Sequence, residues 1–127
     1  MHSALPPHAR RVCGATTRLP ERLVLAALRL APEPYGEPED GRVERRLRCV
    51  REAHARGDHH ARVRDVDGLR AGAVWARWRG SERPRTVAVL PDCPAVQSHH
   101  CGTTPCTAFR NHPGGHSWEL HPGATPA

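Results

Sequence analysis

Cysteine and histidine gather near the C-terminal end of this chain of 127 residues. Zinc takes four nitrogen or sulfur ligands in a tetrahedron, and ligands a few residues apart close short chelate loops. A Cys-x4-Cys pair and a His-x3-His pair have such spacing, and they consist of Cys101, Cys106, His112 and His116. Only five residues separate the two pairs, against about twelve in a classical zinc finger. These four residues are the candidate zinc ligands and Cys93 is at most a spare one. The alternative, which the sequence favours, is a solvated segment whose scattered imidazoles bind zinc weakly.

The other chemically active side chains do not form a recognisable enzyme site. His59 and His60 follow Asp58, and Ser98 precedes His99. Both groups look like fragments of acid–base or nucleophilic sites. Neighbours in sequence point in different directions, whereas a catalytic triad is assembled in space. Cys49 accompanies an apolar stripe and is interpreted as a small packed residue. We therefore predict no catalytic residue.

All 19 basic residues are arginine, and the net charge is +6. Such a charge favours an anionic partner. The arginines of residues 42–56, together with Trp75 and Trp78, are candidates for binding nucleic-acid phosphates and stacking on bases. The alternative is a solvated surface whose arginines reflect GC-rich coding DNA. A GC-rich segment translated in an unselected reading frame has the same composition, and this interpretation also stays open.

Composition also limits the size of any core and indicates the compartment. Leu, Val, Ile and Phe make up 21 of 127 residues, which is below the roughly 20% typical of well-packed domains. No apolar run approaches the about 18 residues of a membrane span, and the N-terminus has no secretory signal pattern. Five cysteines are an odd number without such a signal. We therefore expect a reduced, cytoplasmic protein without a disulfide framework.

Hydrophobic periodicity predicts the order helix, helix, strand, strand, strand. The first helix begins at Pro20 and ends before Pro32. The second is predicted over residues 39–56, because apolar residues recur there with helical spacing. A hairpin follows over residues 60–78 around Asp67-Gly68, a strong type I′ turn signal. The last strand is predicted over residues 86–90.

These elements define the expected domain organisation. Residues 1–18 are a loose leader, residues 19–90 form the domain, and residues 91–127 form a disordered tail that is too poor in large apolar groups to bury a core. No internal repeat is visible. The expected fold class is α+β, with two helices followed by a small antiparallel sheet.

The hairpin segment carries a family resemblance. Asp67-Gly68-Leu69-Arg70-Ala71-Gly72-Ala73-Val74-Trp75 follows an arginine-rich segment and a Gly-Asp pair. In this order residues 10–80 resemble the N-terminal half of a GNAT-type N-acetyltransferase. The resemblance implies an acyltransferase fold, but the glycine loop with which that family binds acetyl-CoA at a helix N-terminus is absent. We therefore expect a truncated or diverged, inactive relative that does not bind acetyl-CoA. The alternative is a small basic protein that binds RNA or another anion, with zinc held by its tail.

Overall fold

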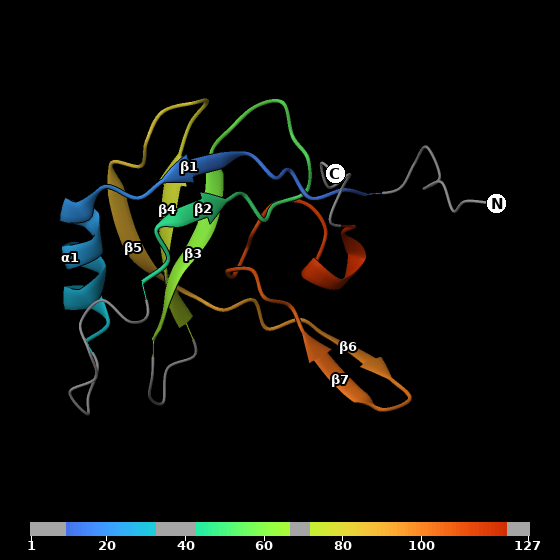
Figure 1. Cartoon of the computed structure of the whole chain (residues 1–127). Coiled ribbons are helices and arrows are strands. Elements are labelled where there is room, and N and C mark those ends of the chain that lie inside the picture. The colour runs from blue at the N-terminus through green and yellow to red at the C-terminus, as the bar shows by residue number, and fades with distance from the viewer. Residues whose placement is uncertain (1–9, 33–42, 67–71, 122–127) are drawn as a thin grey trace.

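The computed structural model describes residues 10–32, 43–66 and 72–121 (Figure 1). Within these ranges the chain forms three small antiparallel sheets, one α-helix and one short 3-10 helix. The elements in chain order are β1 (Thr16–Arg18), α1 (Glu21–Leu30), β2 (Arg46–Arg48), β3 (His59–Val66), β4 (Gly72–Trp78), β5 (Thr86–Pro91), β6 (Val96–His99), β7 (Gly102–Pro105) and the 3-10 helix η1 (Ser117–Glu119).

The predicted fold class, two helices followed by a sheet, is wrong, because the described part of residues 39–56 contains no helix. It forms the strand β2, which pairs with β1. Leu47 is buried between exposed arginines, which is the period of two expected of a strand. Val50, assigned to the apolar helical stripe, is 40% exposed. A helical pattern alone stabilises a helix little, because most helix stability in proteins comes from packing. The pairing of this segment with β1 therefore outweighs its helical apolar spacing. The first four residues of the predicted helix lie outside the described residues.

The first helix is confirmed. Pro20 is its N-cap residue, and Glu21 lies in the first turn, at the positive end of the helix dipole. The buried side chains Leu23, Val24 and Ala27 belong to the main hydrophobic core. This burial, rather than a side-chain cap, holds the helix against the sheet, where it contacts β5.

The three-stranded sheet has the order β3-β4-β5 and contains the predicted hairpin and the predicted last strand. The pairing of β3 with β4 is confirmed, whereas the Asp67-Gly68 turn lies outside the described residues. The register shifts between Arg62 and Arg64, which marks a β-bulge. The bulge explains why Val63 and Val66 break strict alternation in the sequence.

Both faces of this sheet are covered. On one face α1 and the β1–β2 ladder bury the core, which includes Leu47, Val74 and Trp78. On the other face Trp75, only 2% exposed, meets the ring of Phe109 edge-on at 5.1 Å between centroids. The C-terminal segment therefore supplies the second cover of the sheet.

Residues 92–121 carry ordered elements where a disordered tail was predicted. β6 and β7 form a hairpin that projects from the body, and η1 lies on the side of the molecule opposite α1 (Figure 1). Few apolar side chains hold this segment, so other interactions must replace a core. Cys93 and Cys106, both buried, are among the residues that do so.

Candidate metal centres

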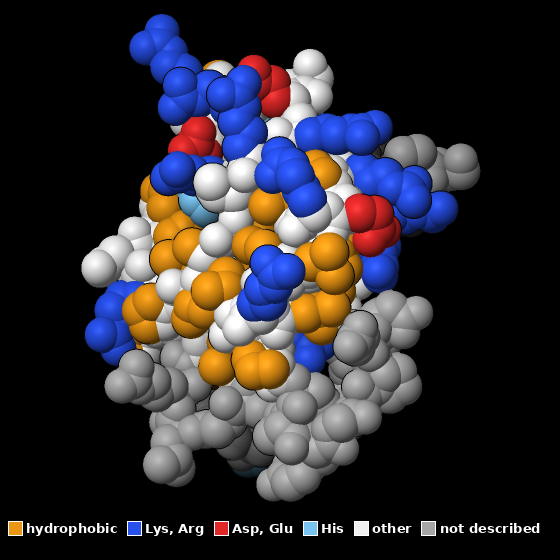
Figure 2. Space-filling view, turned by 90° about the vertical axis from the view of Figure 1, so that its left-hand side faces the viewer, with side chains coloured by type: hydrophobic (Ala, Val, Ile, Leu, Met, Phe, Trp, Pro, Cys, Tyr) orange, Lys and Arg blue, Asp and Glu red, His pale blue; other side chains and the backbone are white. Residues whose placement is uncertain are grey.

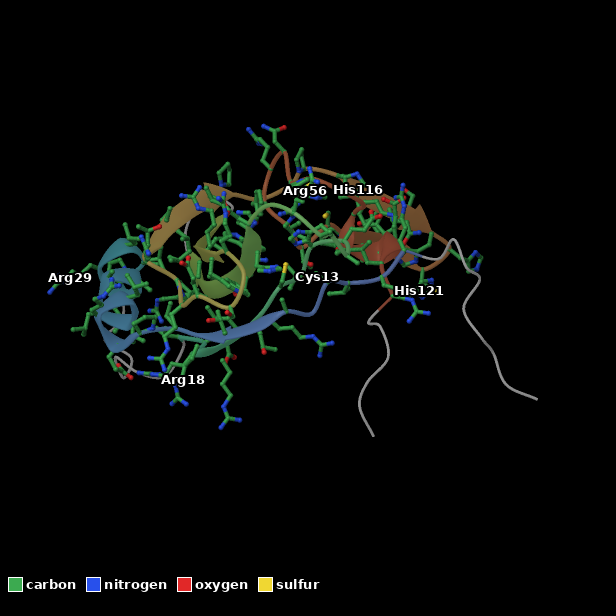
Figure 3. All side chains as sticks on the ribbon, turned by 90° about the horizontal axis from the view of Figure 1, so that it is seen from above. Cys13, Arg18, Arg29, Arg56, His116 and His121 are labelled. Atoms are coloured by element: carbon green, nitrogen blue, oxygen red, sulfur yellow. The ribbon has the colours of Figure 1, made fainter. Side chains whose placement is uncertain are left out.

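Eight cysteine and histidine residues form two clusters in the described part of the chain. The N-terminal cluster is Cys13, Cys49, His54 and His59, and the C-terminal cluster is Cys93, Cys106, His112 and His116. Within each cluster the four ligand atoms lie within 4.8 Å of one another. Figure 3 shows Cys13 near the middle of the molecule and His116 among the C-terminal side chains.

Five of the distances between ligand atoms are close to the edges of a zinc tetrahedron. With bonds of about 2.3 Å to sulfur and about 2.0 Å to nitrogen, tetrahedral angles separate sulfur from nitrogen by about 3.5 Å and two nitrogens by about 3.3 Å. In the C-terminal cluster the two nitrogens, His112 Nε2 and His116 Nδ1, are 3.3 Å apart. Four sulfur–nitrogen distances, two in each cluster, are 3.4 Å (Cys13–His59), 3.6 Å (Cys49–His54), 3.7 Å (Cys93–His116) and 3.5 Å (Cys106–His112).

The cysteines of the two clusters occupy equivalent places on two strand ladders. Cys13 and Cys93 lie three residues before β1 and β6, and Cys49 and Cys106 directly follow β2 and β7. The backbone N–H of each second cysteine donates to the carbonyl two residues after the first, at 2.8 Å for Cys49 and 3.0 Å for Cys106. The N–H of each first cysteine donates to the carbonyl two residues after the second, at 2.7 Å for Cys13 and 2.9 Å for Cys93.

The histidines follow the same scheme. His59 and His116 each come ten residues after the second cysteine, and each faces the first cysteine with Nδ1. His54 and His112 each face the second cysteine with Nε2. Their other ring nitrogen lies near a backbone carbonyl, at 2.8 Å from Arg56 for His54 and 3.3 Å from the next residue for His112. Such a contact fixes the ring and leaves Nε2 to bind a metal.

A glycine occupies the same position in each histidine loop. Gly57 and Gly114 each come eight residues after the second cysteine and two before the last histidine. Their φ angles are +88° and +78°, a left-handed conformation that favours glycine. The two clusters are therefore two copies of one structural unit.

The sequence showed no internal repeat because the copies differ in what joins their strands. In the C-terminal unit two residues join β6 to β7, whereas α1 and residues 33–42 separate β1 from β2 in the N-terminal unit. A fixed period, the usual sign of a repeat, is consequently absent. The common features are the offsets from each second cysteine.

Hydrogen bonding and burial act differently on the two second cysteines. Burial raises the pKa of the Cys49 thiol above its ordinary value. Burial also opposes ionisation of Cys106, but hydrogen bonds from the backbone N–H groups of Ser117 and Ala108 outweigh it and lower the pKa of Cys106 to about 6. Burial and the nearby charge of His54 lower the pKa of His59, which favours the neutral imidazole that binds metals.

The structure brings together three of the four residues predicted as zinc ligands. Cys106, His112 and His116 share the C-terminal cluster, whose fourth member is Cys93. Cys101 is exposed in the turn between β6 and β7 and belongs to neither cluster. The β6–β7 hairpin reverses the chain between Cys93 and Cys106. Cys93 therefore faces the cluster, although Cys101 is nearer to Cys106 in the sequence.

The N-terminal cluster was missed entirely. Cys49 and His54 were placed on a predicted helix, and His59 was weighed only as a fragment of a catalytic site. The spacing Cys49-x4-His54-x4-His59 is the sequence signal that could have indicated it, especially beside Cys106-x5-His112-x3-His116. Cys13 has no neighbouring ligand in the sequence and is brought to the site only by the pairing of β1 with β2.

The predicted stacking of bases on tryptophan is excluded by burial, because Trp75 is 2% and Trp78 is 3% exposed. Within the described ranges the longer helix has ten residues, and neither helix has the length and apolar character needed to cross a membrane.

Comparison of the chain with protein-family models, curated proteins and solved structures found no match. The acetyltransferase resemblance stays a prediction.

Proposed function

We propose that this chain is a zinc-binding protein with two Cys2His2 centres, each of which fixes the fold around it. The observation that carries the proposal is the recurrence of one ligand arrangement, with the same ring nitrogens and tetrahedral edge lengths, at two places in the chain. Chance abundance of cysteine and histidine does not account for two copies with matched backbone hydrogen bonds.

The ligand set favours zinc in a structural role. Two thiolates and two imidazoles in a tetrahedron are typical of zinc, whereas hard cations prefer oxygen ligands. Four protein ligands leave no position for a water molecule or substrate, in contrast to catalytic zinc sites with three protein ligands. Both centres therefore support a structural role rather than hydrolysis.

Each ion would join segments that are distant in the sequence. In the N-terminal unit it would connect the β1–β2 ladder, through its two cysteines, to the start of β3, where His59 lies. In the C-terminal unit it would connect the end of β5 to the loop before η1. Structural zinc supplies folding free energy directly, which suits a chain with few large apolar residues.

Native mass spectrometry of the purified chain tests the proposal. We expect two zinc ions per chain, one in each of the variants Cys49→Ser and Cys106→Ser, and none in the double variant. Cys101→Ser is the matched control, because Cys101 is exposed and lies in neither cluster, and it should retain both ions. A wild-type chain without zinc, or loss of zinc on changing Cys101, would overturn the proposal.

A further inference from the structure

The outer side of the β1–β2 ladder carries a concentration of positive charge. Arg18, Arg46, Arg48 and Arg83 line one open hollow of about 490 Å³, together with the hydroxyl residues Thr16, Thr17 and Ser81. We call the surface formed by these four arginines the arginine face. Arg18 points away from the body in Figure 3, and arginine side chains gather at the upper edge of the surface in Figure 2.

The strand register places like charges opposite each other on this face. Arg18 is the cross-strand partner of Arg46, and both are exposed, while Leu47 points into the core. Like charges directly opposite in an antiparallel pair destabilise it. This arrangement therefore costs stability in the isolated protein, and a bound anion would relieve it.

Acids near the arginine face pair with arginines outside it, as Glu82, next to Arg83 in the sequence, lies 3.9 Å from Arg85. Asp58 pairs with Arg77 and Arg79, which lie outside the face. Among the described residues Arg18, Arg46 and Arg83 form no ion pair. Glu44 lies at one end of the ladder, where its carboxylate accepts a hydrogen bond from the backbone N–H of Arg46.

The C-terminal unit shows that the zinc-binding scaffold does not require this charge. At the positions equivalent to Thr16, Arg18, Arg46 and Arg48 it has Val96, Ser98, Thr103 and Pro105. GC-rich coding acts on both copies alike, so it does not explain why only one of them is basic. The charge belongs to the N-terminal copy specifically.

We propose that the arginine face binds the phosphate backbone of a nucleic acid without reading its bases. Arg46 and Arg48 are alternate residues of β2, about 6.7 Å apart along the strand, and Arg18 lies opposite Arg46. The charges therefore extend over both strands, which fits a repeating anion rather than a single one. Guanidinium groups bind phosphate oxygens through paired N–H donors, and hydroxyl groups add further contacts. None of the residues lining the hollow is aromatic, so the face offers no stacking platform for unpaired bases.

The test is fluorescence anisotropy of the zinc-loaded chain with a labelled duplex DNA and a labelled single-stranded RNA, each about 20 nucleotides long, over a range of salt concentrations. The variant Arg18→Gln/Arg46→Gln/Arg83→Gln removes three charges from the face. The matched control, Arg29→Gln/Arg56→Gln/Arg110→Gln, removes three exposed arginines elsewhere. Figure 3 shows Arg29 at the outer side of α1 and Arg56 on the side of the molecule opposite Arg18.

We expect binding to at least one oligonucleotide, and its logarithmic salt dependence should become shallower by about 2 to 3 in the face variant. Affinity should fall at least about tenfold in that variant and much less in the control. Equal losses in both variants, or no binding to either oligonucleotide at low salt, would overturn the proposal. Binding only to vesicles of phosphatidylserine would also overturn it, in favour of a membrane surface.

Zinc content, measured on the same samples, separates this proposal from that of the zinc centres. If the triple variant does not fold, the single variants Arg18→Gln and Arg83→Gln provide the same comparison, because both residues are exposed. Each single variant should lower the salt dependence by about one.

Discussion

At the scale of single residues, the thiols of Cys49 and Cys106 occupy equivalent positions but differ in how readily they ionise. Burial raises the pKa of Cys49, whereas hydrogen bonds from backbone N–H groups lower the pKa of Cys106 to about 6. A metal displaces the thiol proton, so affinity falls with pH wherever the metal-free thiol is protonated. On acidification from pH 8 to about 6, the N-terminal centre should therefore lose affinity more steeply than the C-terminal one.

Two variants isolate the two centres for this measurement. Cys106→Ser retains the N-terminal centre and Cys49→Ser retains the C-terminal one, and competition with a chromophoric chelator gives the affinity of each across pH. Affinity of the C-terminal centre should fall more gradually over this range, because the Cys106 thiol stays ionised until the pH approaches 6. Parallel pH profiles for the two variants would contradict the prediction.

A side chain at Gly114 should lower the stability of the protein. Its φ is +78°, and a Cβ at this position would lie 2.9 Å from Cβ of Glu52. Gly80 also has a positive φ, +59°, but a Cβ there would meet nothing within 4 Å. Gly80→Ala should cost about 1 kcal/mol from backbone strain, and Gly114→Ala about 1 kcal/mol or more beyond that. Thermal denaturation of the zinc-loaded variants measures both; equal shifts would show that the contact with Glu52 relaxes without cost.

Part of the candidate site could be predicted from the sequence because part of it is local. His112 and His116 are separated by three residues, and Cys106 is near enough to form a chelate loop with them. The sequence could not identify Cys93 rather than Cys101 as the fourth candidate ligand, because this depends on the β6–β7 hairpin between Cys93 and Cys106. Cys13 reaches its cluster only through strand pairing, which no spacing rule contains.

At the scale of elements, the β6–β7 hairpin has little packing to hold it in place. Every side chain of both strands is exposed, so no hydrophobic burial holds the hairpin in place. An isolated two-stranded hairpin is marginal in water. Cys93 and Cys106 flank it, and their backbone N–H groups bond across it. A zinc ion in the C-terminal cluster would therefore close the hairpin at its base.

We predict that Cys106→Ser abolishes hydrogen-exchange protection in residues 96–105 while β4 stays protected. β4 is buried along nearly its whole length and is paired on both sides, so its protection derives from the core. Amide exchange followed by mass spectrometry, with Cys101→Ser as control, makes the comparison. Unchanged protection of the hairpin in Cys106→Ser would show that backbone pairing alone maintains it.

The elements that the sequence predicted correctly are those whose local sequence pattern identifies them without long-range contacts. α1 follows a proline and has an apolar face, β4 consists largely of buried residues, and β5 is a run of apolar residues of which Val87 packs on the core. The segment containing β2 failed because its apolar spacing fits a helix as well as a strand. Its pairing with β1 determines the outcome, and this pairing depends on residues far away in the chain.

At the scale of the whole molecule, polar contacts join the two units in addition to the packing of Phe109 on Trp75 and His60. Glu52 lies between Cys49 and His54 in the N-terminal unit, and its carboxylate accepts a hydrogen bond at 2.9 Å from the backbone N–H of Gly115, next to His116. Arg10 contacts both Glu52 and Glu119, one from each unit. The histidine loops of the two centres are thus in direct contact.

This contact predicts that the two centres bind zinc cooperatively. Ordering either histidine loop positions one side of the hydrogen bond between Glu52 and Gly115, so the second ion meets a loop that is already partly ordered. Coupling between sites is typically about 1–3 kcal/mol, so we expect the C-terminal centre to bind zinc at least about fivefold more tightly when the N-terminal centre is filled. Chelator competition on the wild-type chain and on Cys49→Ser measures the ratio of these two affinities.

The variant Glu52→Ala, added to both backgrounds, tests the contact itself. It should bring the affinity ratio close to one, because the hydrogen bond to Gly115 is lost. The exposed Glu82→Ala is the control and should leave the ratio unchanged. If the ratio persists without Glu52, the sheet between the two units, not their direct contact, carries the coupling.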